Sequence, residues 1–206
     1  VPGQGSQTIA GSWYQVPNGW IELKKVRYLQ GRNPGVPGII YKLEPENTKL
    51  RKLRYVRELW TSIMDLRPVY DIYSEEKMSE KNFDIDHFVP WSFIANDELW
   101  NLMPMEKRLN CSKNNRLPAW DKYFKGFADN QFMMFECVQE KEKVKEIFGK
   151  CYRDNLVTPW SLEQLYISGC EKEKFCRVLE KNLRPIYDSA KMQGYSMWTI
   201  SKETMR

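Results

Sequence analysis

The chain has 206 residues, a net charge of +5 and a hydrophobic content of 42%, which is the composition of an ordinary folded protein. No apolar run approaches the ~20 residues that a membrane-spanning helix needs, and the opening residues VPGQGSQ lack the basic and apolar regions of a signal peptide. We therefore expect a cytoplasmic protein that has no membrane partner.

The five cysteines are odd in number and show no C-x-x-C spacing. This pattern fits neither a disulfide framework nor a zinc ribbon. Because the chain contains a single histidine, a structural zinc site is not expected either. The cysteines are therefore predicted to be free thiols in a reducing compartment.

The positive charge is distributed unevenly along the chain. Residues 1–60 carry ten Lys and Arg against four Asp and Glu, a net +6, so the other 146 residues sum to −1. Within the latter, residues 101–125 carry six basic and two acidic side chains, a net +4. Two basic regions on a near-neutral body favour a polyanionic partner, although solvated helix faces would give the same pattern.

The first part of the chain, residues 1–45, is rich in Gly, Pro and aromatic residues, which predicts turns and short pieces. From Glu46 apolar residues recur at helical spacing while Lys and Arg occupy other faces, so we expect an amphipathic helix that ends near Pro68. On its basic side, Lys52 and Arg54 are candidate nucleic-acid contacts, with a plain solvent-exposed face as an equal alternative.

Two short segments, VYDIY at 69–73 and FDIDHF at 83–88, have the alternation and residue types of strands and are separated by a polar turn. A loop after Pro90 leads to a helix that is expected to begin near Glu106 and to end before Pro118. This region therefore predicts two strands followed by a helix.

The C-terminal part is predicted to be helical. One helix is expected at about 138–152, a second after Thr158, and a third at 171–184, which Pro185 should end or kink. The chain is thus expected to be an α+β protein in three parts: a basic N-terminal accessory segment at 1–66, a compact core at 67–125 and a helical C-terminal extension at 126–206.

The only histidine, His87, directly follows Asp86 at the end of the second predicted strand. A lone histidine in an apolar stretch is more often structural than catalytic. However, Asn110, Lys113 and Asn114 lie at i, i+3 and i+4 on one face of the next helix, and a hairpin of this length can bring that face against the strand. Carboxylate and amide oxygens suit Mg²⁺, and a neutral imidazole can accept a proton from water. Such a cluster suits phosphodiester hydrolysis.

Together, FDIDHFVPWSF, ELWNLMP and LNCSKNNRLP resemble the HNH (His-Asn-His) endonuclease family, which has the ββα-metal fold. The spacing matches as well, with fourteen residues from His87 to Asn101 and nine more to Asn110. The chain is similar to the branch with a final Asn in place of the second His, which occurs in stand-alone bacterial HNH proteins and in the HNH domain of CRISPR nucleases. The resemblance covers about residues 69–120.

The resemblance implies a role for each matching residue. His87 would be the general base that activates water, and Asn101 would orient His87 and brace the loop through backbone hydrogen bonds. Asp86 and Asn110 would bind one divalent ion, Mg²⁺ or Mn²⁺. Asp84 is expected to be a surface or loop-bracing acid, with a second acidic metal ligand as the less favoured alternative. Seven side chains are candidate nucleic-acid contacts, of which two (Lys113 and Asn114) have loop bracing as their alternative: Lys52, Arg54, Lys107, Arg108, Lys113, Asn114 and Arg116.

The function that the resemblance implies is metal-dependent hydrolysis of DNA, with RNA as an open alternative, to products with 5′-phosphate and 3′-hydroxyl ends. One alternative is the nuclease module of a larger antiviral defence or guide-directed complex that cuts only when recruited. The missing initial Met keeps this option open, because we expect a fragment or a processed chain. The other alternative is a catalytically silent nucleic-acid-binding module, which the intact Asp86, His87, Asn101 and Asn110 disfavour.

Overall fold

The computed structural model of the protein describes residues 13–16, 19–22 and 52–200. The first two ranges form an antiparallel hairpin of β1 (Trp13–Val16) and β2 (Gly19–Glu22). Most of the basic segment that the sequence predicts at 1–66 therefore lies outside the described residues.

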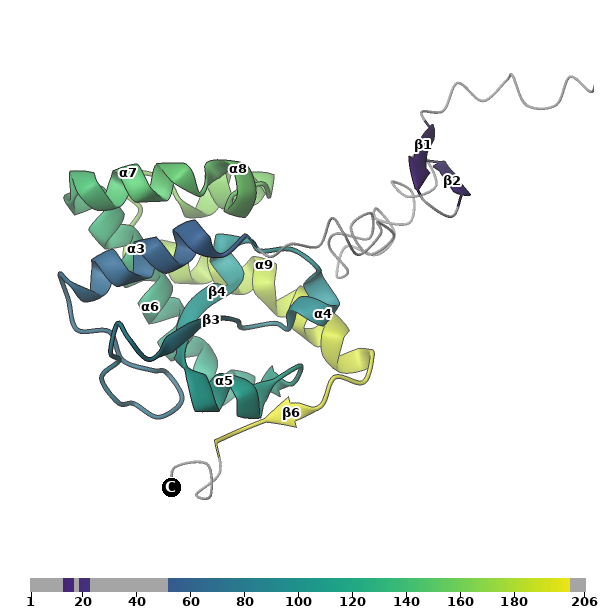
Figure 1. Cartoon of the computed structure of the whole chain (residues 1–206), viewed down its shortest axis with the longest axis horizontal. Helices are drawn as coiled ribbons and strands as arrows, with labels where there is room; N and C mark the ends of the chain where they lie inside the picture. Colours follow the sequence, from purple (N-terminus) through teal and green to yellow (C-terminus); the bar gives the residue numbers. More distant parts are fainter. Residues whose placement is uncertain (1–12, 17–18, 23–51, 201–206) are drawn as a thin grey trace, which may run out of the picture.

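The centre of the fold is a hairpin followed by a helix (Figure 1). Strands β3 (Phe83–His87) and β4 (Leu102–Glu106) pair in antiparallel fashion, and α5 (Lys107–Lys113) begins at the next residue. The Glu106 carboxylate accepts a hydrogen bond of 3.0 Å from the Leu109 amide and so satisfies one of the free N–H groups in the first turn of α5. Helices together with small sheets confirm the predicted α+β class.

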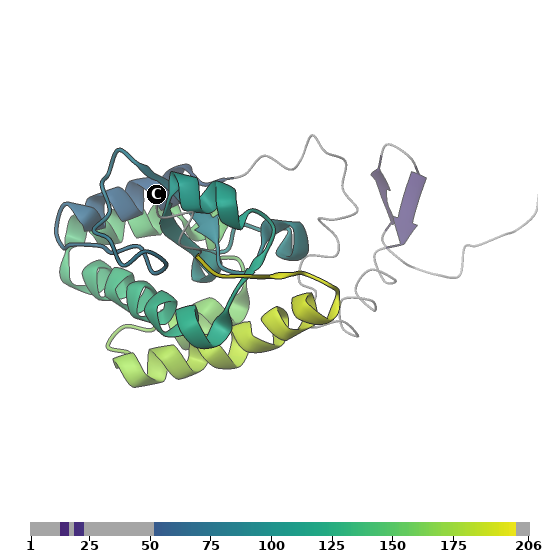
Figure 2. The same cartoon turned by 90° about the horizontal axis from the view of Figure 1, so that it is seen from below.

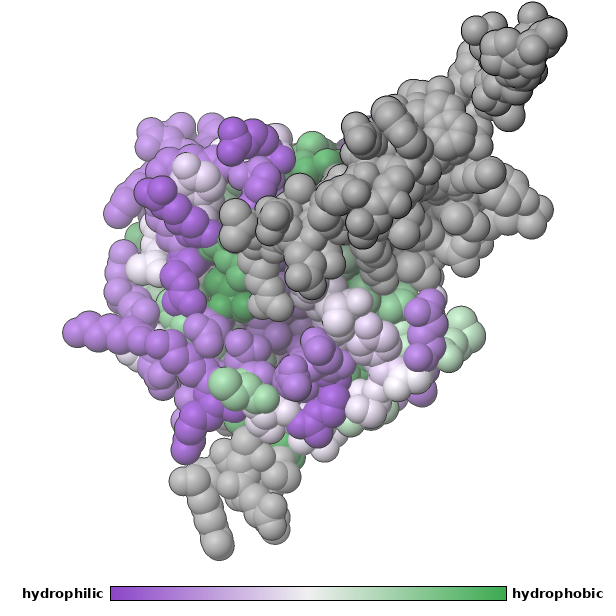
Figure 3. Space-filling view, turned by 45° about the vertical axis from the view of Figure 1, so that its right-hand side comes forward, coloured by the Kyte–Doolittle hydropathy of each residue, from purple (hydrophilic) through white to green (hydrophobic). Residues whose placement is uncertain are grey.

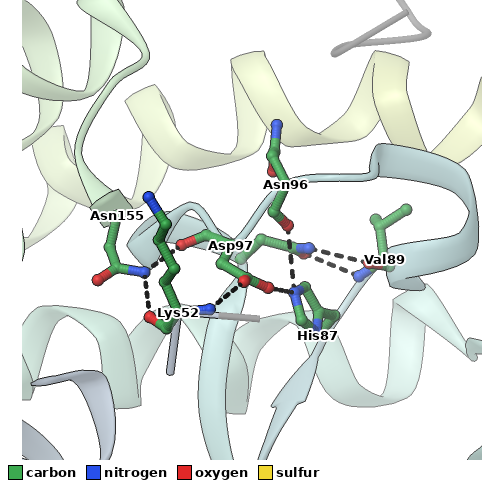
Figure 4. A network of polar contacts seen from close by, with 7 residues as sticks. Lys52, His87, Val89, Asn96, Asp97 and Asn155 are labelled. Carbon is green, nitrogen blue, oxygen red and sulfur yellow. Dashed lines mark hydrogen bonds and ion pairs between the residues drawn. The ribbon is translucent and has the colours of Figure 1, made fainter. Parts of the chain in front are cut away.

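The connection from β3 to β4 is folded back on itself. It contains the short helix α4 (Trp91–Ile94) and the 3₁₀ turn η2 (Leu99–Asn101). Ala95 ends α4 with a φ of 56°, in the left-handed region that residues with a Cβ seldom adopt. This sharp turn sends Asn96 and Asp97 back towards the end of β3 (Figure 4).

Helices surround this centre. In Figures 1 and 2, α6 and α9 lie on one side of the hairpin and α5 lies on the other, while α3 packs against α7. The bounds of the helices are α3 (Arg54–Met64), α6 (Trp120–Glu140), α7 (Glu142–Lys150), α8 (Tyr152–Asn155) and α9 (Lys172–Met192).

The helical extension and the hairpin share one hydrophobic core. Phe88, which directly follows β3, stacks on Phe127 of α6 with 4.4 Å between ring centroids. It also meets Trp120 edge-on at 5.9 Å, and Tyr187 of α9 packs against Trp120 at 4.9 Å. The three-part division of the chain remains a prediction, and its boundary between residues 125 and 126 lies inside α6.

The C-terminal end of the described chain pairs with the segment that follows α5. Strand β6 (Met197–Trp198) pairs in parallel with β5 (Leu117–Pro118), which follows α5. The Leu117 amide donates to the Ser196 carbonyl at 2.9 Å, and the Ala119 amide donates to the Trp198 carbonyl at 3.0 Å. These bonds fix the segment that joins α5 to α6.

The predicted strand at 69–73 is wrong. These residues form turns with one isolated bridge, between Tyr70 and Lys77. The cause is the buried Asp71, whose Oδ1 accepts hydrogen bonds from the amides of Tyr73 at 2.8 Å and Ser74 at 3.2 Å. An aspartate that bonds to the backbone two residues ahead favours a turn over a strand.

Helix ends in the C-terminal part also differ from the prediction. The helix expected at 138–152 is two helices, because α6 ends at Glu140 and α7 starts at Glu142. The helix expected after Thr158 is a short π-helical segment, η3 (Ser161–Leu165). Helix α9 continues through Pro185 to Met192, because packing of its apolar face outweighs the one hydrogen bond that proline removes.

The surface agrees with a protein that buries its apolar residues. On the face in Figure 3, hydrophilic side chains dominate and hydrophobic ones occupy a few separate areas. Among the described helices, none combines the length and the apolar composition that crossing a bilayer requires. All five cysteines are free, and three of them are buried.

Candidate active site

A hollow of about 210 Å³ lies between the end of β3 and α5. We call it the active-site hollow, because three of the four residues expected at the site line it, namely Asp86, His87 and Asn110. Asn114, a candidate nucleic-acid contact, lines it as well. The hairpin and α5 thus bring together residues that are up to 28 positions apart in the chain.

In the described part of the chain, the ring of His87 is held through one of its nitrogens (Figure 4). Its Nε2 lies 3.2 Å from the carbonyl oxygen of Asn96 and 3.0 Å from Oδ1 of Asp97. Because a carbonyl oxygen can only accept, Nε2 carries the proton of the neutral ring. Among the described residues nothing hydrogen-bonds to Nδ1, so its lone pair is free at a ring that borders the hollow. This is the arrangement that a general base needs.

Asp97 is a site residue that the sequence did not reveal. Its side chain is only 8% exposed and, besides its contact with His87, its Oδ2 accepts a hydrogen bond from the backbone N–H of Lys52 at 2.8 Å. Asn155 of α8 donates from Nδ2 to the Asp97 carbonyl at 2.7 Å and to the Lys52 carbonyl at 3.0 Å. The only signal in the sequence was an acidic residue in the loop after His87.

Asp86 forms a buried ion pair with Lys113. The Lys113 ammonium nitrogen lies 2.9 Å from Oδ2 and donates a hydrogen bond of 3.2 Å to Oδ1. It also donates to the backbone carbonyl of His87 at 2.7 Å. Lys113 is fully buried, so its ammonium group is directed to the interior and not to a nucleic-acid backbone. This placement corrects the predicted direct contact and favours the loop-bracing alternative.

The donors in the active-site hollow fit a hard divalent ion. Among the described residues, the buried Asp86 Oδ2 has no partner besides the Lys113 ammonium group, and none hydrogen-bonds to the side chain of Asn110. Among the described residues no three His, Cys, Asp or Glu side chains come together as a ligand group. One carboxylate and one amide suit Mg²⁺, which keeps most of its water, and the ion would share Asp86 with Lys113.

Asn101 braces the loop, and no hydrogen bond joins its side chain to the imidazole. Its fully buried carboxamide accepts a hydrogen bond from the Val89 amide at 2.8 Å and donates to the Val89 carbonyl at 2.9 Å. The Phe88 amide donates to the Asn101 carbonyl at 2.9 Å. These bonds agree with the expected bracing through the backbone, and the hydrogen-bond partners of the imidazole itself are Asn96 and Asp97.

The remaining candidate contacts lie at the surface. Lys107 and Arg108 are exposed in the first turn of α5, and Arg54 is exposed on α3. Arg116 donates to the backbone carbonyls of Ser112 and Lys113 at the end of α5 and is also exposed. Figure 4 shows Lys52 near the site through its backbone. Its ammonium group pairs with Asp154 at 2.7 Å, which lowers the pKa of that carboxyl group.

Asp84 is not directed at the site. Its Oδ1 lies 3.1 Å from Arg57 of α3, and both side chains are well exposed. The same Arg57 donates to the carbonyl of Phe83 at 2.8 Å. The position of Asp84 agrees with the surface acid that the sequence suggested.

Two strands, a helix and an Asp-His pair that faces an asparagine form the arrangement of a ββα-metal nuclease. Residues 71–119, which include β3, β4, α5 and β5, match the family model described as HNH endonuclease. This match confirms the HNH resemblance and indicates nuclease activity in general, with a nucleic-acid substrate and the divalent metal that HNH nucleases generally use. A search of curated proteins found no match to the chain.

Proposed function

We propose that the protein is a metal-dependent endonuclease that hydrolyses phosphodiester bonds in DNA. The observation that carries the proposal is the free Nδ1 of His87 at the same hollow as Asp86 and Asn110. Nε2 hydrogen-bonds to two acceptors, whereas Nδ1 has no partner among the described residues. The imidazole can therefore accept a proton at Nδ1.

In the proposed reaction, Nδ1 of His87 takes a proton from the water that attacks phosphorus. The imidazolium that forms is stabilised by the Asp97 carboxylate at Nε2, 3.0 Å away. Asp86 and Asn110 would hold one Mg²⁺ or Mn²⁺, which when bound stabilises negative charge on the phosphate and on the leaving 3′ oxygen. Lys113 and Asn101 keep the end of β3 and the following loop in place around these groups.

A second hollow adjoins the active-site hollow. It has a volume of about 530 Å³ and shares Cys111, Asn114 and Asn115 with the active-site hollow. Arg116 and Tyr195 also line it. We infer that the strand next to the scissile phosphate lies here, because a guanidinium can meet a phosphate and a tyrosine ring can stack on a base of any identity.

The proposal is tested with supercoiled plasmid, linear DNA and RNA incubated with Mg²⁺ or Mn²⁺, and with EDTA as the metal-free control. The wild type is compared with His87→Ala and with Met192→Ser, whose side chain is 82% exposed on α9. We expect cleavage by the wild type and by Met192→Ser, and none by His87→Ala or in EDTA. Equal loss of substrate with the wild type and with His87→Ala would reveal a contaminating nuclease and overturn the proposal, as would intact substrates throughout.

A further inference from the structure

We propose that Asn155, on α8 and outside the segment that matches the HNH family, positions the general base through Asp97. Asn155 and the Lys52 backbone hold the loop that carries Asp97, and this loop fixes the tautomer and orientation of His87. The effect on catalysis rests on the proposed function, whereas the structural link from Asn155 through Asp97 to His87 does not.

The link consists of short contacts in sequence (Figure 4). Asn155 Nδ2 donates to the Asp97 carbonyl at 2.7 Å, and Asp97 Oδ1 accepts from His87 Nε2 at 3.0 Å. The second carboxylate oxygen of Asp97 is engaged by the Lys52 amide at 2.8 Å. Both carboxylate oxygens therefore have donors, so the carboxylate has one orientation in which all its contacts are made.

Burial strengthens these hydrogen bonds and makes their loss costly. Asn155 is fully buried, and the side chains of His87 and Asp97 are 4% and 8% exposed. Away from water a hydrogen bond is stronger, and a donor or acceptor that loses its partner is costly. The loop cannot easily exchange these partners for solvent.

Asn155 positions both groups that accept a hydrogen bond from the imidazole, the Asn96 carbonyl and the Asp97 carboxylate. The Asn96 carbonyl belongs to the peptide group that precedes Asp97, so a shift of the Asp97 backbone also displaces the Asn96 oxygen from His87 Nε2. Asn155 Oδ1 has no hydrogen bond in the part of the chain that the structure describes. The contribution of Asn155 to the loop therefore comes from its Nδ2 donor, which also bonds to the Lys52 carbonyl at 3.0 Å.

The fact that His87 is the only histidine gives a direct measurement. In ¹⁵N-labelled protein, at a pH where the ring is neutral, long-range ¹H–¹⁵N spectra report which ring nitrogen carries the proton. We expect the wild type to show Nε2–H alone. Asp97→Ala and Asn155→Ala should shift both ring nitrogen signals and populate the Nδ1–H tautomer.

Asn182→Ala is the matched control, because Asn182 also donates from Nδ2 to a backbone carbonyl, that of Val178 at 2.8 Å, but lies on α9 outside the site. Its spectrum should equal that of the wild type. Asn155→Asp keeps the shape of the side chain and removes its donor, so it should behave like Asn155→Ala. If one of the two Asn155 variants does not fold, the other carries the test, and Asp97→Ala tests the contact with His87 separately.

Cleavage kinetics supply the second readout. We expect Asp97→Ala to lower kcat roughly 10- to 100-fold, less than the 10²- to 10⁴-fold that a general base itself contributes, with KM and Mn²⁺ affinity unchanged. Asn155→Ala should lie between this variant and the wild type. Unchanged ring nitrogen signals in folded Asp97→Ala and Asn155→Ala would overturn the link. If the signals shift as expected and the wild type cuts nothing, the nuclease proposal fails and the link stands.

Discussion

The ammonium nitrogen of Lys113 and the carboxylate of Asp86 lie 2.9 Å apart, and Lys113 is fully buried. The same ammonium group donates to the backbone carbonyl of His87. A single cation thus ties α5 to both residues of the Asp-His pair. Because each charge depends on the other in the interior, loss of one partner leaves an uncompensated charge.

Lys113→Met should therefore lower the free energy of unfolding by about 3–5 kcal/mol, the usual cost of breaking a buried ion pair. Urea denaturation measures the change. The control is Lys172→Met, which removes an exposed pair with Asp129 at 2.7 Å and should cost less than about 1 kcal/mol. Similar small losses in both variants would show that the buried pair does not hold the site together.

Asn110→Ala should abolish binding of the divalent ion without loss of the fold, because no described residue hydrogen-bonds to the Asn110 side chain. Ligand binding stabilises the folded state, by about 2.7 kcal/mol when the ligand is at a hundred times its Kd. Added Mn²⁺ should therefore raise the Tm of the wild type and leave that of Asn110→Ala unchanged. Asn115→Ala, which alters the same hollow, should respond like the wild type. An equal rise in Tm in all three proteins would exclude Asn110 as a ligand.

Stability should fall with rising pH because of Glu98. Burial raises the pKa of this carboxyl group from 4.5 to about 7, and the side chain accepts a hydrogen bond from the Val157 amide at 3.3 Å. In the unfolded chain Glu98 loses its proton near pH 4.5, but the folded protein retains it up to about pH 7. Its stabilising contribution is thus complete below pH 4.5 and is lost between pH 4.5 and 7, on the order of 3 kcal/mol.

Urea denaturation of the wild type and of Glu98→Gln at several pH values tests this expectation. The neutral amide cannot ionise, so the variant should lose less stability than the wild type between pH 4.5 and 8. Asp71, whose pKa is also raised by burial, contributes equally to both proteins. Parallel stability curves would mean that Glu98 does not titrate differently in the folded state.

Arg116→Gln should weaken the salt dependence of nucleic-acid binding, since each phosphate contact adds about one unit to the slope of log K against log salt. Binding is measured by fluorescence anisotropy with labelled single-stranded DNA in a His87→Ala background, so that no substrate is cut. Lys145→Gln removes an equally positive residue on α7 and should leave the slope unchanged. If both variants keep the wild-type slope, the strand does not use the second hollow.

Strand β3, the start of α5 and the Asp-His pair could be predicted because they are encoded locally, whereas the partner strand was expected at 69–73 and lies instead at Leu102–Glu106. The motif spacing places Asp86, His87 and Asn110, and Glu106 is a helix cap three residues before the amide it accepts from. Lys113 shares a helix face with Asn110, as predicted, yet a basic residue on an amphipathic helix does not reveal that its ammonium group is buried.

The role of Asp97 could not be predicted for a different reason. Its contacts come from Lys52 and Asn155, which are 45 and 58 positions away in the chain. Its direction depends on the left-handed turn at Ala95. Hydrophobic periodicity and motif spacing do not predict the path of a loop. The contact between the Asp97 carboxylate and His87 is therefore visible only in the folded structure.

The stack of Phe88 on Phe127 limits how much of the chain could be moved into another protein as a working unit. Residues 71–119 match the family model, but the ring next to His87 packs against α6, and Tyr187 of α9 donates to the Pro118 carbonyl at 2.8 Å. Excised alone, the segment would expose these aromatic and polar surfaces to water. The smallest unit that keeps these contacts therefore includes α6 and α9 together with residues 71–119.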